Sequence, residues 1–174
     1  MSNNKRLSIK GTLSLEDFIK YNKYHLNKTV TIYFIICFFI LFAIIQGPLS
    51  GDLFFIIIFA GIPSLIISSL LFLFAKTVNK QRAIKEFNSD QLIKKETMYS
   101  FSSEGIEQKI RRSSNYFEWD DFLFAIEREE IFLLYVSKHK AIVLPKSFFG
   151  STNEIVLFKG IVSTNMEASK VRFN

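Results

Sequence analysis

The residues of this chain that could take part in catalysis are few and poorly placed for it. Two pairs of adjacent acids, Asp120-Asp121 and Glu129-Glu130, come nearest to a general acid–base pair. Adjacent residues of a β-strand point to opposite faces, so neither pair presents both carboxylates to one substrate. We therefore interpret both pairs as surface or turn positions, and we predict no catalytic residue and no enzymatic activity.

Metal and redox chemistry have equally little support in the sequence. The two histidines, His25 and His139, are far apart, and neither has a cysteine or a second histidine at ligand spacing. The single cysteine, Cys37, lies inside an apolar segment, so the chain has no disulfide framework. The sequence contains no glycine-rich phosphate loop, no serine nucleophile elbow and no HExxH motif. We predict no metal site and no cofactor.

Two long apolar segments dominate the chain instead. Val30–Ile45 and Leu53–Ala75 contain no charged residue, and the short stretch 46–52 separates them. A membrane-spanning helix needs about 20 apolar residues to cross roughly 30 Å of hydrocarbon. The second segment meets this length, and the first comes close to it with Thr29 included. The pattern therefore predicts a hairpin of two transmembrane helices.

A soluble core or a signal peptide would account less well for these apolar segments. Core helices of a soluble protein that are apolar on every side need a larger protein around them. A cleaved signal peptide would end in a small-x-small site, whereas here a second apolar segment follows at once.

Positive charge flanks both apolar segments. Residues 1–28 and 76–95 each contain six basic and two acidic residues, whereas 46–52 contains only Asp52. Because basic flanks stay on the cytoplasmic side, we predict a multi-pass protein with both termini in the cytoplasm. Residues 96–174 contain ten basic and eleven acidic residues, so the excess charge lies beside the membrane. We therefore expect no nucleic-acid binding.

The residues before the first apolar segment predict a strand and a helix. Leu7-Ser8-Ile9 alternates in polarity, and we expect it to add an edge strand to a sheet formed by the C-terminal region. Ser14 and Asp17 form a capping-box pattern, so a juxtamembrane amphipathic helix is expected from Leu15.

The second apolar segment carries its own packing signals. Ala60, Ser64 and Ser68 form a stripe of small residues that permits close helix approach. Either the first apolar helix or a second copy of the chain could cover this stripe. Pro63 lacks a backbone donor and should kink the helix between Phe59 and Pro63.

Beyond residue 96 the apolar period changes to two, which predicts short antiparallel strands. Arg111-Arg112 is expected in a solvated hairpin loop, and Trp119 in the core with its indole N–H on a nearby acceptor. A capping-box pattern at 151–154 predicts a closing helix with Phe158 directed inward. The expected strands are 97–101, 106–110, 117–119, 122–128, 131–137 and 140–144, the last one ended by Pro145.

Several stretches resemble the YcxB-like family of bacterial membrane proteins. They are the opening Gly11–His25, then Tyr99–Ile106, Trp119–Phe122 and Phe132–Lys146. The resemblance implies two membrane helices in a bacterial plasma membrane and a cytosolic domain similar to a pleckstrin-homology fold, and it implies no established activity. Family members often have a basic residue after the Pro-Lys pair, whereas this chain has Ser147, which argues against an anion-binding cluster there.

The expected fold class is therefore membrane α+β, with a transmembrane hairpin and a small antiparallel sheet domain closed by a C-terminal helix. The segments are 1–28 (strand and juxtamembrane helix), 29–75 (hairpin, with spans 29–45 and 53–75 and outer loop 46–52), 76–95 (helical connector) and 96–174 (β-rich domain).

Two functions fit this organisation. The first is a membrane-anchored interaction or regulatory module whose partners are the lipid bilayer and a protein bound by the cytosolic domain. The alternative is a pleckstrin-homology-like domain that senses anionic lipid headgroups, supported by the juxtamembrane charge. The near-neutral charge of 96–174 favours the first. The sequence leaves the biological role, the ligand and the oligomeric state open.

Overall fold

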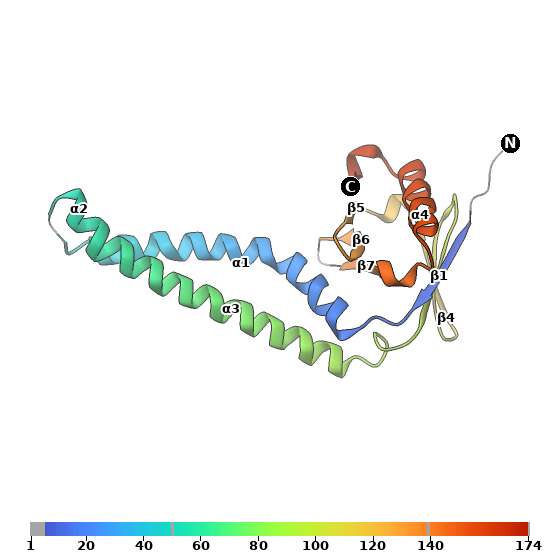
Figure 1. Cartoon of the computed structure of the whole chain (residues 1–174), viewed down its shortest axis with the longest axis horizontal. Coiled ribbons are helices and arrows are strands. Elements are labelled where there is room, and N and C mark those ends of the chain that lie inside the picture. The colour runs from blue at the N-terminus through green and yellow to red at the C-terminus, as the bar shows by residue number, and fades with distance from the viewer. Residues whose placement is uncertain (1–5, 50, 139, 174) are drawn as a thin grey trace. The chain divides into compact units, whose positions relative to one another are not determined.

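The computed structural model describes residues 6–49, 51–138 and 140–173. They form two compact units: a helical unit, Ile19–Glu86, and a sheet unit, which joins the residues up to Phe18 with those from Phe87 onward (Figure 1).

The helical unit consists of two long helices. Helix α1 (Leu15–Gln46) is continuous, so the expected juxtamembrane helix and first span are one helix. Its capping box is confirmed: the Ser14 hydroxyl accepts the Asp17 N–H at 3.1 Å, and the Asp17 carboxylate accepts the Ser14 N–H at 3.2 Å. The returning segment comprises α2 (Leu53–Ile56), the π-helical η1 (Ile57–Gly61) and α3 (Ile62–Ser89). Thr29–Gln46 and Leu53–Ser89 are long and apolar enough to cross a membrane.

Before Pro63, where the sequence predicts a kink, the structure has the π-helical segment η1. In a regular α-helix the Pro63 ring would meet the carbonyl of Phe59, and one hydrogen bond would be lost. In η1 the turn is wider, and the Ile62 N–H bonds to the Ile57 carbonyl five residues back. The segment thus accommodates proline within a helix that continues to Ser89.

The stripe of small residues is buried within the hairpin. Ala60, Ser64 and Ser68 are each no more than 1% exposed. The Ser64 hydroxyl donates to the Ala60 carbonyl at 2.6 Å, and the Ser68 hydroxyl donates to the Ser64 carbonyl at 2.5 Å. Both polar groups are therefore satisfied within their own helix. This burial confirms packing of the stripe inside the hairpin, rather than on a face left for a second copy.

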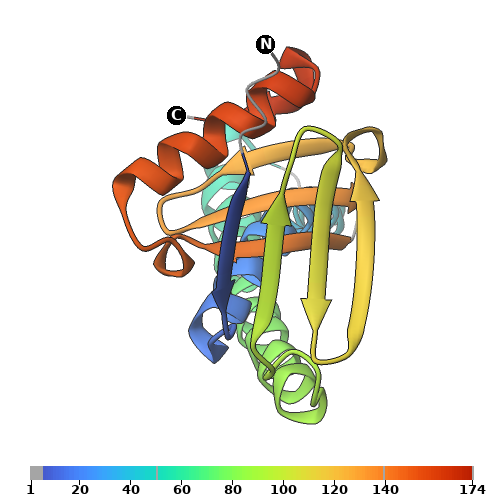
Figure 2. The same ribbon diagram turned by 90° about the vertical axis from the view of Figure 1, so that its right-hand side faces the viewer.

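The sheet unit contains two four-stranded sheets and a helix (Figure 2). The first sheet is antiparallel, with β1 (Leu7–Gly11), β2 (Thr97–Phe101), β3 (Gly105–Ile110) and β4 (Ser113–Glu118) side by side in that order. The second has the order β7-β6-β5-β8, from β5 (Phe124–Glu127), β6 (Ile131–Ser137), β7 (Lys140–Pro145) and β8 (Val171–Arg172). Helix α4 (Thr152–Asn165) precedes β8, which pairs parallel to β5.

The expected N-terminal edge strand is confirmed as β1. It pairs antiparallel with β2, with Ile9 opposite Tyr99. Leu7 and Ile9 are buried in the core, while Ser8 between them is exposed, as period-two alternation requires. At the end of the strand, a side chain on Gly11 would overlap the Phe148 ring, so this close approach requires glycine.

The prediction around Trp119 was right for Phe117 and Glu118, which lie in a strand, and wrong for the residues on either side of them. Residues 113–116, expected in a loop, belong to β4, and Trp119 begins the short 3-10 helix η2 (Trp119–Asp121). Residues 113–116 are exposed on both faces of this edge strand, so they lack the alternation that identifies half-buried strands. The predicted strand 122–128 is shorter in the structure, since β5 begins only at Phe124.

Aromatic side chains fill the space between the sheets. The Trp119 ring lies 6.0 Å from that of Phe122, and its Nε1–H donates to the Ser102 carbonyl at 3.1 Å, as predicted. From α4, Phe158 contacts Phe101 and Phe132, with ring centroids 5.0 and 4.9 Å apart. Helix α4 therefore supplies a central part of the core, as expected of the closing helix.

We predict that Ile9→Ala destabilises the sheet unit by about 2 to 4 kcal/mol, because it removes buried methyl groups from the β1–β2 contact. The fluorescence of the single tryptophan, Trp119, reports this unfolding in the full chain. Ser8→Ala on the exposed face is the matched control and should change the midpoint of thermal unfolding little. Equal midpoints for the two variants would contradict the placement of β1 in the core.

Candidate functional site

The acid pairs identified in the sequence lie in exposed turns. Asp120 and Asp121 belong to η2, where the Asp121 carboxylate accepts the Glu118 N–H at 2.9 Å, and Glu129-Glu130 forms the β5–β6 turn. His139 and the side chain of His25 lie outside the described residues. Among those that are described, no group of three potential ligands could hold a metal ion.

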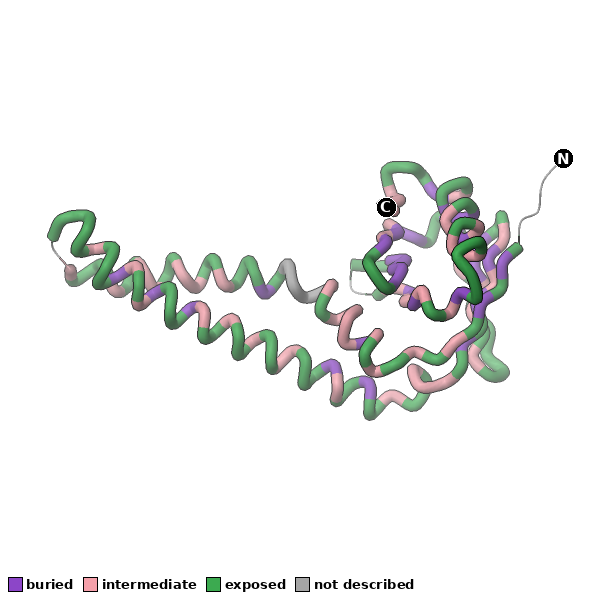
Figure 3. Tube along the Cα trace, viewed as in Figure 1, coloured by how far each residue is buried: buried purple, intermediate pink, exposed green. Residues whose placement is uncertain are grey.

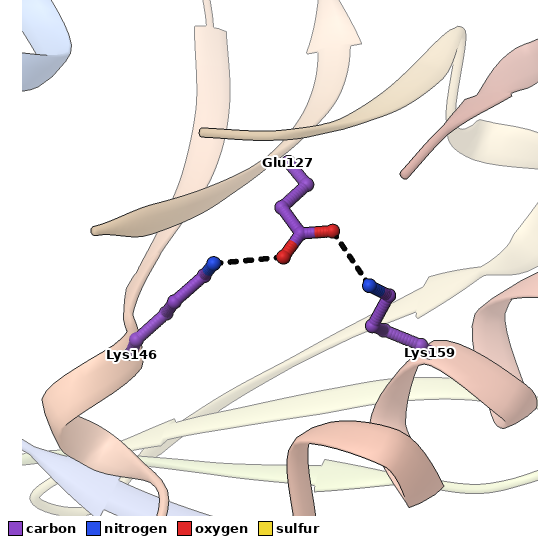
Figure 4. Close-up of polar contacts among 3 residues, drawn as sticks. All are labelled: Glu127, Lys146 and Lys159. Atoms are coloured by element: carbon purple, nitrogen blue, oxygen red, sulfur yellow. Dashed lines mark hydrogen bonds and ion pairs between the residues drawn. The ribbon is translucent and has the colours of Figure 1, made fainter. Parts of the chain in front are cut away.

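A buried carboxylate lies instead at the end of β5. Glu127 is 8% exposed, and its two oxygens accept from Lys146 and Lys159, each at 2.7 Å (Figure 4). Lys146 opens the short helix η3 (Lys146–Phe148), and Lys159 projects from α4. One side chain thus ties the second sheet to η3 and to the closing helix.

An aromatic ring lies near each of the two ammonium groups. The Lys146 Nζ lies 5.2 Å from the centroid of the Phe132 ring, and the Lys159 Nζ lies 5.9 Å from that of Phe173. Phe173 follows β8 and packs against Phe132 with centroids 5.6 Å apart. The ion cluster therefore also holds the C-terminal residues against the core through cation–π contacts.

The sequence contained one signal for this cluster. Along β5 the alternation places Glu127 on the same side as Ala125, and both are buried. A charged residue on a core face needs a partner. The lysines, 19 and 32 residues further along the chain, could not be identified as those partners from spacing alone.

The chemistry of this cluster is structural. Each carboxylate oxygen of Glu127 is bonded to an ammonium group, so both oxygens are engaged in contacts within the protein. The lysine side chains are only 28% and 26% exposed. We assign the cluster the role of positioning η3, α4 and the C-terminal residues.

The outer edge of β4, the last strand of the first sheet, is exposed. Within the described residues β4 pairs only with β3, and Tyr116 is 53% exposed. The Ser114 hydroxyl donates to Glu107 on β3 at 2.7 Å. This bond, followed by the charge of Lys109, lowers the pKa of Glu107 below its ordinary value. The β3–β4 turn holds Arg111 at a φ of 55°, which confirms the predicted hairpin loop.

The comparisons with known proteins match part of the chain to one family. Residues 101–162 match the family described as YcxB-like protein. The chain is also 31% identical over 108 residues to the uncharacterized protein YcxB of Bacillus subtilis (strain 168). This match covers 62% of the chain and 57% of that relative, little more than half its length. No solved structure matches the chain.

We predict that Glu127→Gln destabilises the sheet unit by about 2 to 4 kcal/mol, because it removes the negative charge that two partly buried ammonium groups contact. Glu129→Gln in the exposed turn is the control and should be neutral within about 0.5 kcal/mol. Trp119 fluorescence during thermal unfolding of the full chain measures both. A Glu127→Gln protein as stable as the wild type would show that the cluster does not hold α4.

Proposed function

We propose that this chain is a membrane-anchored interaction module without catalytic activity. The proposal rests on the match of residues 101–162 to the YcxB-like family and on two helices that are long and apolar enough to cross a membrane. In this proposal α1 and α3 form a transmembrane hairpin in the bacterial plasma membrane. The sheet unit is a pleckstrin-homology-like domain in the cytoplasm, and it binds an extended segment of a partner protein along β4.

The exposure of the helical unit supports the membrane placement. Among residues 29–46 of α1, Val30 is the one residue classed as buried, and only 17% of the most apolar window of the second helical segment is buried (Figure 3). Large apolar side chains such as Ile44, Phe54 and Phe74 are 66 to 73% exposed. Core helices of a soluble protein would cover such side chains, whereas lipid solvates them.

Chain connectivity supports both termini on one side. Strands β1 and β2 are hydrogen-bonded neighbours, yet the whole helical unit lies between them in sequence. A helical insertion that leaves one strand and returns to its neighbour crosses the membrane an even number of times. This argument is independent of the positive-inside rule and agrees with it.

The architecture of the sheet unit supports the pleckstrin-homology-like assignment. Its two sheets enclose one aromatic core, which a C-terminal helix closes. Headgroup sensing by this domain is the second candidate, which the same architecture favours. Ten basic and eleven acidic residues over 96–174 leave little charge with which to attract an anionic surface.

The observation that carries the interaction proposal is the free edge of β4. An exposed strand edge can take an extended peptide as an additional strand, through main-chain hydrogen bonds. The other strand edges are less suitable. Phe148 packs against the end of β1, the edge strand β8 has only two residues, and β7 carries Pro145, which cannot donate to a new strand.

The β3–β4 register identifies which backbone groups face a partner. A two-residue turn joins Ile110 to Ser113, so these two residues form a hydrogen-bonded pair, and such pairs then alternate along the ladder. The N–H groups of Ser114 and Tyr116 therefore point away from β3. They are the donors that a bound strand would use.

We predict that the residue after α1 is exposed outside the cell, while the sheet unit is not. In a Cys37→Ser background, Gly47→Cys should react with a membrane-impermeant maleimide in cells stripped of their wall. Glu129→Cys should react only after lysis. Labelling of both positions in intact cells would contradict the topology.

We predict that a photocrosslinking amino acid at Tyr116 yields a discrete adduct in native membranes, whereas one at exposed Val156 on α4 does not. Ser114→Pro should abolish the adduct, because it removes an outward-pointing N–H without breaking the β3–β4 ladder. Ser114→Ala should retain it, and Trp119 fluorescence should show both variants folded. An adduct that survives Ser114→Pro would exclude strand addition at β4.

A further inference from the structure

A positively charged cavity lies between α1 and α3, just beyond the apolar segments. It has a volume of about 210 Å³. Lysine and asparagine side chains from both helices line it, together with apolar side chains that include Val30 and Ala83. Its polar lining residues are Asn22, Lys23, Lys76, Asn79 and Lys80.

Helical spacing brings these polar side chains together. Lys76, Asn79 and Lys80 occupy positions i, i+3 and i+4 of α3, and Asn22 and Lys23 lie on the facing side of α1. None of the three lysines forms an ion pair with a carboxylate among the described residues. Like charges that face one another across a cavity repel, so an anion bound between them would stabilise the helix pair.

A second, apolar cavity continues from the first. It measures about 650 Å³ and shares Val30 and Asn79 with the charged cavity. Its walls include Phe34, Cys37 and Leu71, and it extends as far as Ser68. From Asn79 to Ser68 the helix rises by about 16 Å at 1.5 Å per residue. This length matches one leaflet of a hydrocarbon core about 30 Å thick.

The ammonium group of Lys76 lies where the two cavities meet. The Lys76 Nζ lies 4.2 Å from the centroid of the Phe72 ring, which lines the apolar cavity, while Lys76 itself lines the charged one. A ligand that fills both cavities therefore needs a negative group at one end and a hydrocarbon chain beyond it.

We propose that this composite cavity binds one anionic glycerophospholipid. Its phosphate lies among Lys23, Lys76 and Lys80, and one acyl chain lies along the groove toward Ser68. The inference rests on the proposed membrane placement of the hairpin, and it is independent of the β4 edge. A free phosphate would satisfy the lysines but would leave the apolar groove without a role.

The test titrates the full chain in detergent with 1-palmitoyl-2-oleoyl phosphatidylglycerol or with the matching phosphatidylcholine, and native mass spectrometry counts bound lipid. We expect one phosphatidylglycerol to bind at least about tenfold more tightly than phosphatidylcholine. Lys76→Gln/Lys80→Gln should remove this preference. Arg82→Gln/Lys85→Gln, which removes the same charge from the same helix outside the cavity, should keep it. Equal losses in the two double variants would overturn the site in favour of diffuse attraction.

A second pair of variants separates a lipid from a free anion. Cys37→Trp should obstruct the groove and weaken phosphatidylglycerol binding about tenfold with all lysines in place, whereas Ile44→Trp on the lipid-exposed surface should not. If Cys37→Trp has no effect, or if millimolar inorganic phosphate displaces the lipid, the lipid assignment is wrong. Alkaline carbonate extraction separates failure of the membrane placement from failure of the lipid site. Release of the chain from membranes would refute the membrane placement. Retention of the chain without a preference for phosphatidylglycerol would refute only the lipid site.

Discussion

The pairing of β1 with β2 is the constraint on which the rest of the molecule depends. It joins residues about 90 positions apart in sequence, with the whole helical unit between them. The first sheet is complete only when the chain has left it, formed two long helices and returned. The helical unit is thus an insertion into the sheet unit, and the two cannot be separated by cutting the chain at one point.

A second constraint is the need to satisfy a charge inside the sheet unit. Glu127 is buried on the core side of β5, and lysines from η3 and α4 compensate its burial by reaching both oxygens. The same lysines lie near the rings of Phe132 and Phe173, so one ion cluster orders three segments that follow β5 in sequence. Binding at β4 would leave this cluster undisturbed, because β4 belongs to the other sheet.

Much of this fold could be predicted from local patterns. Capping residues located the starts of α1 and α4. Alternation located β1 and β2, which bury one face, and a run of apolar residues located β6. Residues 113–116 of β4 were missed, because edge residues exposed on both faces carry no period. The Glu127 cluster and the lysine-lined cavity depend on which distant segments meet, and spacing along the chain does not encode that.

The insertion of the helices between β1 and β2 also has a consequence for synthesis. A ribosome that adds about 5 to 20 residues per second needs about 4 to 17 s to pass from Gly11 to Thr97. During that interval β1, with Leu7 and Ile9 uncovered, has no strand to pair with. If the two helices span a membrane as proposed, their insertion would precede formation of the first sheet, and β1 would stay unpaired until β2 emerges.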